Sequence, residues 1–261
     1  MTIPSSSLTI VSWNVLADSY VKPEYFPHTA PALLEPTTRR LRLVRRLTEI
    51  AADGADVLCL QEVEPEVFAM AEGALASFAG RWVSKVGKPD GCAIFVRHTL
   101  GPVTFRELAF RDGTGHVAVA ATIDEGTRTT SIATTHLKWQ AHDIPPETRL
   151  GRGELLELLD AWVTTGERWI VCGDLNAPAD SPVLEVAYAR GFVDAYASMP
   201  EANTANANGR RKRIDFILHT KDWAATPAAI PVIDDLTPLP SETEPSDHLA
   251  IKAALVALAT S

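Results

Sequence analysis

The sequence contains little cysteine, and it has no apolar run long enough to span a membrane. The three cysteines, Cys59, Cys92 and Cys172, lie far apart inside apolar stretches, without the close pairing that zinc sites show. We therefore predict that the three cysteines are small buried side chains of a protein in a reducing compartment. None of them is expected to be a catalytic thiol. The most apolar late stretch, LAIKAALVALA, is interrupted by Lys252 and is far too short to cross a bilayer.

The chain also lacks an excess of positive charge, because 33 Asp and Glu residues outnumber 24 Lys and Arg residues and give a net charge of −9. A field of this sign repels polyanions, so any contact with nucleic acid is expected to be local. The first residues lack a basic start followed by an apolar stretch, which predicts a cytoplasmic protein without a membrane partner. No repeat or linker divides the sequence, so we predict one domain over residues 1–261 and no obligate protein partner.

Five short polar motifs stand out because each lies at the end of an apolar stretch. They are SWNVL around Asn14, CLQEVE around Glu62, TTHLKW around His136, CGDLNAP around Asp174 and Asn176, and PSDHLAI around Asp247 and His248. Strands that end in carboxylate, amide or histidine bring such side chains to one rim of a sheet. Oxygen ligands and imidazoles gathered at one rim indicate a metal-assisted hydrolase.

Eight stretches with an alternating or continuous apolar pattern predict β-strands. They lie within residues 8–15, 55–63, 90–97, 116–124, 129–137, 169–176, 213–220 and 246–258. Helical spacing separates only some of these stretches, and several strands follow one another between Asp90 and Leu137. This pattern predicts an α/β fold in which two mixed sheets form a sandwich flanked by helices.

Two longer helices are predicted from apolar residues at helical spacing. The first has Thr37 or Thr38 as its N-cap, and its apolar face consists of Leu41, Val44, Leu47 and Ile50. The second begins at Pro145 and Pro146 and ends at Gly166. A shorter helix follows Ser181. The polar and then basic segment 203–213 receives no assignment.

Glu62 ends a predicted strand, where its carboxylate can hold a hard cation such as Mg²⁺ together with water. Asp174 and Asn176 are two residues apart, so in an extended segment their side chains point the same way. A carboxylate and an amide so placed can activate and orient a water molecule. The alternative is a simple turn, because Gly, Asp, Asn and Pro all form turns.

His248 and Asp247 precede the last apolar stretch, and Asp215 offers His248 a carboxylate partner. Such a partner fixes the tautomer of the imidazole and favours its charged form. Asp215 has a second interpretation, as a neutralising partner of nearby arginines. His136 can equally be a histidine of the core, but it ends an apolar stretch inside a motif, as His248 begins one.

Taken in order, SWNVL, LQEVE, DGCAIF, THLKW, GDLNAP, RIDFIL and PSDHLAI resemble the endonuclease/exonuclease/phosphatase superfamily over about Leu8 to Leu258. DGCAIF, THLKW and LPSETEPSDHLAI are similar to its subgroup of poly(A) deadenylases, nocturnin and 2′,5′-phosphodiesterases. The resemblance implies a four-layer α/β sandwich with two mixed, mainly antiparallel sheets. It also implies Mg²⁺-dependent attack of water on phosphorus, with Mn²⁺ able to substitute.

The resemblance further implies a role for each residue of the motifs. The roles are metal binding for Glu62, Asn14 and Asp247, substrate contact for Asn14, activation and orientation of water for Asp174 and Asn176, and stabilisation of phosphoryl oxygens for His136 and for His248 with its partner Asp215. Lys138 and Arg149 stand where nocturnin-like proteins place basic residues beside substrate phosphates. Arg152 departs from this pattern, because a glutamine is usual there.

One feature of the deadenylases is missing. They carry aromatic residues before the Ile-Asp strand that help to hold adenine, whereas this chain has none between Tyr196 and Phe216. Stacking on an aromatic ring contributes roughly 1–3 kcal/mol per base. We therefore expect a weak preference for poly(A).

The leading hypothesis is a Mg²⁺-dependent phosphoesterase that acts on RNA 3′ ends or short oligonucleotides, as a 3′–5′ exoribonuclease does. One alternative is a nucleotide phosphatase acting on the 2′-phosphate of an NADP-type substrate. Another is a nucleic-acid-binding module that kept the fold and lost catalysis. The expected polar positions are all filled, which favours an enzyme.

Overall fold

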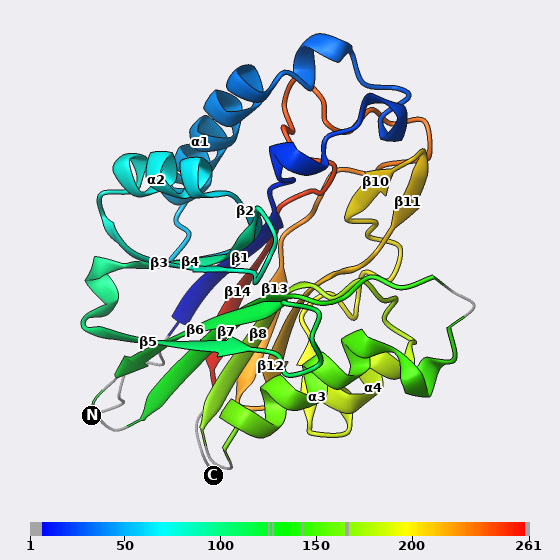
Figure 1. Cartoon of the computed structure of the whole chain (residues 1–261). Helices are drawn as coiled ribbons and strands as arrows, with labels where there is room; N and C mark the ends of the chain where they lie inside the picture. The colour runs from blue at the N-terminus through cyan, green and yellow to red at the C-terminus, as the bar shows by residue number, and fades with distance from the viewer. Residues whose placement is uncertain (1–6, 125, 127, 142–143, 165–166, 259–261) are drawn as a thin grey trace.

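The computed structural model describes residues 7–124, 126, 128–141, 144–164 and 167–258. The first sheet has the strand order β13-β14-β1-β2-β4-β3, and the second sheet has the order β5-β6-β7-β8-β12-β9. The pairs β1–β2 and β7–β8 are parallel, and the other neighbouring strands of the described residues run antiparallel. A short hairpin of β10 and β11 lies apart from both sheets (Figure 1).

The strands and helices have the following bounds. The first sheet consists of β1 (Ser7–Asn14), β2 (Val57–Val63), β3 (Phe78–Ser84), β4 (Gly91–Arg97), β13 (Trp223–Pro227) and β14 (Ile251–Ala257). The second consists of β5 (Val103–Ala109), β6 (Val117–Asp124), β7 (Thr129–His136), β8 (Arg168–Asp174), β9 (Phe192–Asp194) and β12 (Asp215–Thr220). The hairpin is β10 (Ala205–Ala207) with β11 (Arg210–Lys212), and the helices are α1 (Pro36–Ala52), α2 (Pro65–Ala74), α3 (Leu150–Trp162) and α4 (Pro182–Tyr188).

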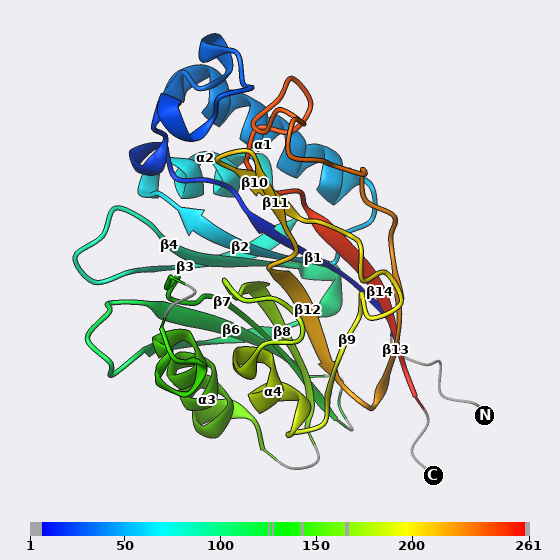
Figure 2. The ribbon, with the colours of Figure 1, turned by 90° about the vertical axis from the view of Figure 1, so that its right-hand side faces the viewer.

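Both faces of each sheet are buried, and this explains the continuous apolar runs in the sequence. Along β8, Ile170 and Cys172 point into the core between the sheets, whereas Trp169 and Val171 point outward against α3 and α4. Strand β2 does the same with α1 and α2 on its outer face. The order of layers is therefore helix, sheet, sheet, helix (Figure 2), which confirms the predicted four-layer α/β sandwich.

The first helix differs from its predicted form at both its start and its face. It begins at Pro36, and the N-cap is Glu35, whose carboxylate accepts backbone N–H groups 3.2 and 2.8 Å away; Thr37 or Thr38 as the cap was wrong. Its buried residues are Arg39, Leu43, Leu47 and Ile50, while Leu41 is 60% exposed.

Arg39 takes a place on the buried face of α1 because its charge has partners. Its guanidinium pairs with Asp18 and donates to the carbonyl oxygen of Val15 at 2.8 Å. The helix thereby holds the loop that follows β1. A pattern of apolar residues alone cannot predict this, since the buried position is filled by a charged side chain.

The other helices agree with the prediction in part. The second predicted helix starts at Leu150, after a 3-10 turn over Pro146–Thr148, and ends at Trp162, while its predicted end at Gly166 lies outside the described residues. The short helix α4 follows Ser181 as predicted. The predicted strands are all present, but α2 and the shorter or more exposed strands β3, β5, β9, β10, β11 and β13 had no clear pattern.

The three cysteines are buried free thiols in the core between the sheets, which confirms their predicted burial. Burial raises the pKa of Cys92 to about 12, so its thiol stays protonated. No helix among the described residues is both long enough and apolar enough to cross a membrane.

Candidate active site

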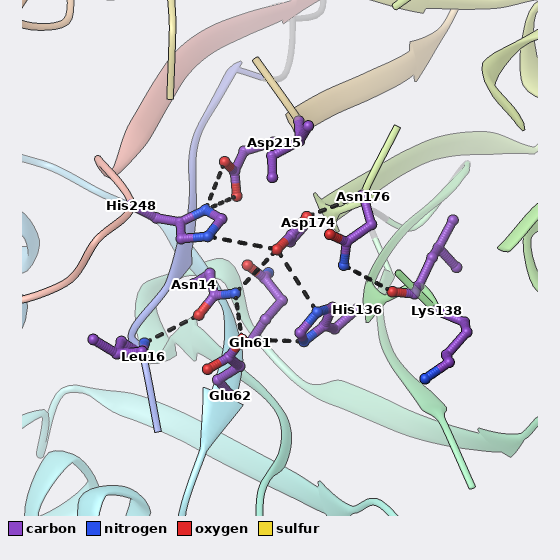
Figure 3. A network of polar contacts seen from close by, with 12 residues as sticks. Asn14, Leu16, Gln61, Glu62, His136, Lys138, Asp174, Asn176, Asp215 and His248 are labelled. Atoms are coloured by element: carbon purple, nitrogen blue, oxygen red, sulfur yellow. Dashed lines mark hydrogen bonds and ion pairs between the residues drawn. The ribbon is translucent and has the colours of Figure 1, made fainter. Parts of the chain in front are cut away.

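The polar motifs meet at one rim of the sandwich, where parallel strands end and antiparallel strands begin. Strand β1 ends at Asn14, β7 at His136 and β8 at Asp174. Strand β12 runs the other way and begins at Asp215, opposite Asp174. His248 lies just before β14, which is antiparallel to β1. Both sheets thus contribute to a single cluster (Figure 3).

Glu62 reaches this cluster because β2 is irregular beside it. In a regular strand Glu62 would share the outer face with Leu58 and Leu60, under the helices. The pairing of β2 with β4 shifts register between Leu60 and Val63, so that Val63 takes the outer position. Glu62 itself has the left-handed φ of 57°, which is uncommon for a residue with a side chain. This local strain turns the carboxylate toward the rim.

Asn14 joins two carboxylates of the cluster. Its Nδ2 donates to Glu62 Oε1 at 3.0 Å and to Asp174 Oδ2 at 3.1 Å. Its Oδ1 accepts the backbone N–H of Leu16, and Glu62 Oε2 accepts the N–H of Ala17. The amide of Asn14 therefore fixes the loop after β1 and holds the two acids side by side. Its role as a metal ligand stays a prediction.

Asp174 and Asn176 lie together for a different reason from the predicted alternation along a strand. The strand ends at Asp174, whose Oδ1 accepts the backbone N–H of Asn176 at 2.9 Å, and Asn176 has a φ of 50°. This is the turn that the composition GDLN favours. Gly173 is required before it, because a Cβ there would lie 1.9 Å from the carbonyl oxygen of Thr135. The turn and the predicted catalytic pair are therefore the same structure.

His248 is held by the carboxylate that the sequence suggested. Its Nδ1 donates to Asp215 at 2.9 Å, and Asp215 also accepts the hydroxyl of Thr204 at 2.6 Å. Burial alone would lower the pKa of His248, but Asp215, Asp247 and Asp174 raise it well above its ordinary value. These surroundings favour the imidazolium form of His248, whose Nε2 lies 3.7 Å from Asp174 Oδ2.

His136 has a partner that the sequence did not indicate. Lys85 Nζ lies 3.1 Å from His136 Nδ1 and 2.5 Å from Asp90 Oδ2, and the hydroxyl of Tyr20 donates to Asp90 Oδ1 at 2.8 Å. Burial, Lys85 and nearby histidines lower the pKa of His136 well below its ordinary value. These surroundings favour the neutral form of His136, although its Nε2 also lies 3.7 Å from Asp174 Oδ2.

Burial makes ionisation of the acids in the cluster unfavourable, and nearby cationic groups offset this only in part. Burial raises the pKa of Asp174 to about 7, against the opposing effect of His248. Burial also raises the pKa of Glu62, and Asp247 adds to this by its negative charge. Two ionised carboxylates in a buried site are unfavourable unless a cation joins them.

The donors at the rim fit a hard divalent cation. Glu62, Asp174 and Asp247 offer carboxylate oxygens, which Mg²⁺ and Mn²⁺ prefer. Asp174, Asp215 and His248 also lie within 4.8 Å of one another, but Asp215 and His248 already satisfy each other as an ion pair. A protonated imidazole cannot bind a metal. The side of Glu62 and Asp247 is therefore the better place for a cation.

The two predicted phosphate contacts lie in different surroundings. Arg149 lines a cavity of about 290 Å³ next to Asn176, together with Trp139. Lys138 is not part of that lining; its backbone N–H donates to Glu154 at 2.6 Å, and its side chain lies away from the dashed contacts in Figure 3. The geometry thus gives Arg149 a place beside the site, while the role of Lys138 stays a prediction.

A buried polar contact beneath the rim joins the two sheets. Gln61 of β2 donates from Nε2 to the hydroxyl of Thr134 of β7 at 2.8 Å. Both side chains are buried, so the bond forms in the dry interior. It fixes the strand that carries Glu62 relative to the strand that carries His136. The glutamine is part of the motif CLQEVE, but its side of the strand could not be known without the second sheet.

Comparison with known protein families identifies one match over most of the chain. The model of the endonuclease/exonuclease/phosphatase family matches residues 11–248. Mouse nocturnin is 28% identical over 288 residues, which cover 94% of this chain and 65% of that protein. Mouse 2′,5′-phosphodiesterase 12 is 22% identical over 315 residues, which cover 94% of this chain and 51% of that protein. The chain thus spans between about half and two thirds of the length of these relatives.

Solved structures share the fold. A structure of ANGEL2, described as a 2′,3′-cyclic phosphatase, superposes with a TM-score of 0.80 at 17% identity and covers 97% of this chain and 95% of that one. The catalytic domain of human nocturnin with bound sulfate superposes with a TM-score of 0.72 at 23% identity and covers 98% of this chain and 99% of that one. At these identities the likeness establishes the architecture.

Proposed function

The chain belongs to the endonuclease/exonuclease/phosphatase family, and from that membership we propose that it is a divalent-cation-dependent phosphoesterase. Its substrates are RNA 3′ ends or short oligonucleotides, in which it hydrolyses phosphodiester bonds. The match of 94% of the chain to a relative named as a 2′,5′-phosphodiesterase supports this chemistry.

One observation carries the proposal. Asp174 lies between two histidines, and the Nε2 atom of each is 3.7 Å from the same carboxylate oxygen. A base with a pKa of about 7 suits removal of a proton from water near neutral pH. An imidazolium and a neutral imidazole beside it suit the stabilisation of charge on phosphoryl oxygens.

Each group then has a defined part in the reaction. Asp174 takes the proton of the attacking water. Asn176 uses its Nδ2 to bind the carbonyl oxygen of Leu137 at 2.9 Å, so its Oδ1 is left to accept a hydrogen bond from that water. His248, held charged by Asp215, donates from Nε2 to a phosphoryl oxygen, and His136 does so from the other side.

The cation is held chiefly by Glu62, with Asp247 in support. When bound, it draws electron density from a phosphoryl oxygen and so makes the phosphorus more open to attack. Asn14 keeps Glu62 and Asp174 at a fixed separation through its amide nitrogen. Lys85 compensates part of the charge of Glu62 from the opposite side.

The cavity beside Asn176 supports a nucleotide substrate. Arg149, Arg211, Lys212 and Arg213 line it, and its described lining contains no carboxylate, in contrast to the acidic chain as a whole. Trp139, which is 55% exposed, provides a flat aromatic face in the same cavity. It supplies from a different segment the aromatic that is absent between Tyr196 and Phe216.

The size of the cavity also favours a second candidate, a phosphatase acting on the 2′-phosphate of an NADP-type nucleotide. At about 290 Å³ it lies near the lower end of the roughly 300–1,000 Å³ that small-molecule sites occupy. A site of this size suits one nucleotide better than a long strand. The same groups at the rim would serve either reaction.

A substrate screen separates these activities. The full chain in Mg²⁺ is incubated with oligo(A), mixed RNA, 2′,5′-linked oligoadenylate, NADP, duplex DNA and sphingomyelin. We expect hydrolysis of one or more of the first four, and loss of that hydrolysis in excess chelator and in Glu62→Gln. Full activity in either condition would contradict the proposed use of a cation.

The cavity is tested by substitution at Arg149. Loss of a hydrogen bond to a charged group costs about 1.5–3 kcal/mol, so Arg149→Ala should raise KM for the nucleotide substrate by about 10–150-fold. Hydrolysis of bis(p-nitrophenyl) phosphate, which has no second phosphate, should change little. Trp139→Ala should behave in the same way, and Trp139→Phe should retain most of the affinity. Equal losses with both substrates would place these residues in the reaction centre or the fold.

A further inference from the structure

The loop between β3 and β4 brings a buried lysine to the back of His136. Lys85 begins this loop and Asp90 ends it, and their side chains are 2% and 0% exposed. The ammonium lies 2.5 Å from Asp90 Oδ2 and 3.1 Å from His136 Nδ1. Tyr20, from the loop after β1, donates to the other oxygen of Asp90. A lysine so enclosed does not reach toward solvent or a large substrate.

We infer that Lys85 is a positioning residue that fixes the tautomer of His136. An ammonium group has donors and no acceptor, so a hydrogen bond between Nζ and Nδ1 requires Nδ1 to be the acceptor. With Nδ1 unprotonated, the one N–H of the ring is on Nε2, the nitrogen that lies on the Asp174 side. Lys85 thus directs the N–H of His136 into the site.

A competing partner for the same nitrogen is weaker. Glu62 Oε1 lies 3.8 Å from His136 Nδ1, beyond hydrogen-bond range, whereas Lys85 Nζ lies at 3.1 Å. If Nδ1 carried a proton, that N–H would face the ammonium donor directly. Without Lys85, the proton could move to Nδ1 and toward Glu62, and Nε2 would lose its donor.

Asp90 and Tyr20 keep the lysine in place. The carboxylate of Asp90 binds the ammonium with one oxygen and the phenol of Tyr20 with the other. The backbone N–H of Lys85 donates to the carbonyl oxygen of Asp90 at 2.9 Å and closes the loop. The chain of contacts therefore runs from Tyr20 through Asp90 and Lys85 to His136, from the loop after β1 to the end of β7.

The tautomer can be measured directly in the resting protein. The full chain is labelled with ¹⁵N-histidine, and long-range ¹H–¹⁵N correlation spectra are recorded at neutral pH with Mg²⁺. His136→Gln assigns the signal. We expect the pattern of an imidazole protonated on Nε2, and in Lys85→Met a shift of the proton to Nδ1 or a mixture of the two forms. Lys85→Arg should restore the original pattern, because a guanidinium is also a donor without an acceptor.

A matched control and a kinetic measurement complete the test. Lys88→Met removes a charge from the same loop and leaves the Lys85 contact in place, so it should keep the His136 proton on Nε2. If the proposed phosphoesterase activity is present, Lys85→Met should lower kcat by roughly 10–100-fold, as loss of a residue that supports a functional group does, with KM little changed. An unchanged tautomer in Lys85→Met, or a rise in KM without loss of kcat, overturns the inference. The tautomer is read without a substrate, so this outcome is independent of the proposed function.

Discussion

His136 and His248 have similar surroundings at Nε2, the side that faces Asp174, and opposite surroundings at Nδ1, the other side of the ring. Each Nε2 lies 3.7 Å from Asp174 Oδ2. Behind His248 the partner of Nδ1 is the carboxylate of Asp215, and behind His136 it is the ammonium of Lys85. A carboxylate accepts a proton and an ammonium donates one, so the two rings differ in charge.

This difference suits the two histidines to the two different tasks proposed for them within a single site. In the proposed reaction, the ring of His248 would offer positive charge to a developing anion, whereas the ring of His136 would offer a directed N–H without adding charge. Two imidazolium ions flanking Asp174 would lower its pKa and weaken it as a base. Because Lys85 disfavours the charged form of His136, it would also help to keep Asp174 basic in the proposed reaction.

The largest effect on turnover is expected at Asp174, which both histidines face. Asp174→Asn removes the base that both histidines face, so turnover should fall by at least the roughly 10²–10⁴-fold attributed to a positioned general base. The fold should survive, because the side chain keeps its size. Turnover is measured in Mg²⁺ and thermal unfolding is monitored in parallel. Rates close to those of the parent chain would remove Asp174 from this role.

The next effect concerns the His248 side alone. His248→Ala should lower turnover by roughly 10²–10³-fold, as removal of one stabilising donor does. Asp215→Ala acts through the same ring, so the double variant should resemble the worse single variant. Combination of His248→Ala with Lys85→Met should instead multiply the two losses, since Lys85 acts on the other ring. A simple product of the His248 and Asp215 effects would contradict their pairing.

A smaller effect appears as a displaced pH profile. The pKa of His248 is raised, so the ring stays charged at pH values above the ordinary pKa of histidine. Activity that needs the charged ring should therefore be lost only as the pH rises through the raised pKa. Asp215→Asn removes the main raising charge, so this alkaline loss should move to lower pH. Lys85→Met should leave it in place. The comparison is made from kcat/KM between pH 6 and 10, and an equal displacement in both variants would show that the two sides are not separate.

The smallest effect tests the bond that joins the two sides beneath the site. Thr134→Val removes the hydroxyl that Gln61 binds, and we expect a loss of about 1 kcal/mol in the free energy of unfolding. Turnover should change less than tenfold. Thr104→Val, on an exposed position of β5, is the control and should leave the stability unchanged. Urea unfolding measures both; an unchanged Thr134→Val would mean that the bond adds nothing to the fold.

The rim of the site was predictable because it follows from strand ends. Asn14, His136 and Asp174 each end an apolar run. Such a run can be recognised in the sequence without knowing which face of the strand is buried. The sandwich of two sheets flanked by helices was predictable from the order of strand and helix patterns, and the family resemblance implied its four layers. Their catalytic and metal-binding roles stay predictions, as do the single domain and the cytoplasmic location.

What was missed depends on contacts between segments far apart in the sequence. Lys85 lies in a short polar loop, where a lysine ordinarily faces solvent, and it is buried with its partner Asp90, whose other carboxylate oxygen accepts the hydroxyl of Tyr20. The buried face of α1 was misplaced because Arg39 is neutralised by Asp18, which lies in a different element. Neither pairing leaves a periodic pattern in the sequence.

The left-handed backbone at Glu62 and Asn176 has a consequence for how such a chain evolves. A residue with a side chain in that conformation destabilises the fold by about 1–3 kcal/mol, and glycine at either position would relieve it. Ionisation of buried Asp174 adds to the burden. A library selected only for heat resistance should therefore accumulate changes at the very residues that define the rim, and only a screen that also demands turnover would keep them.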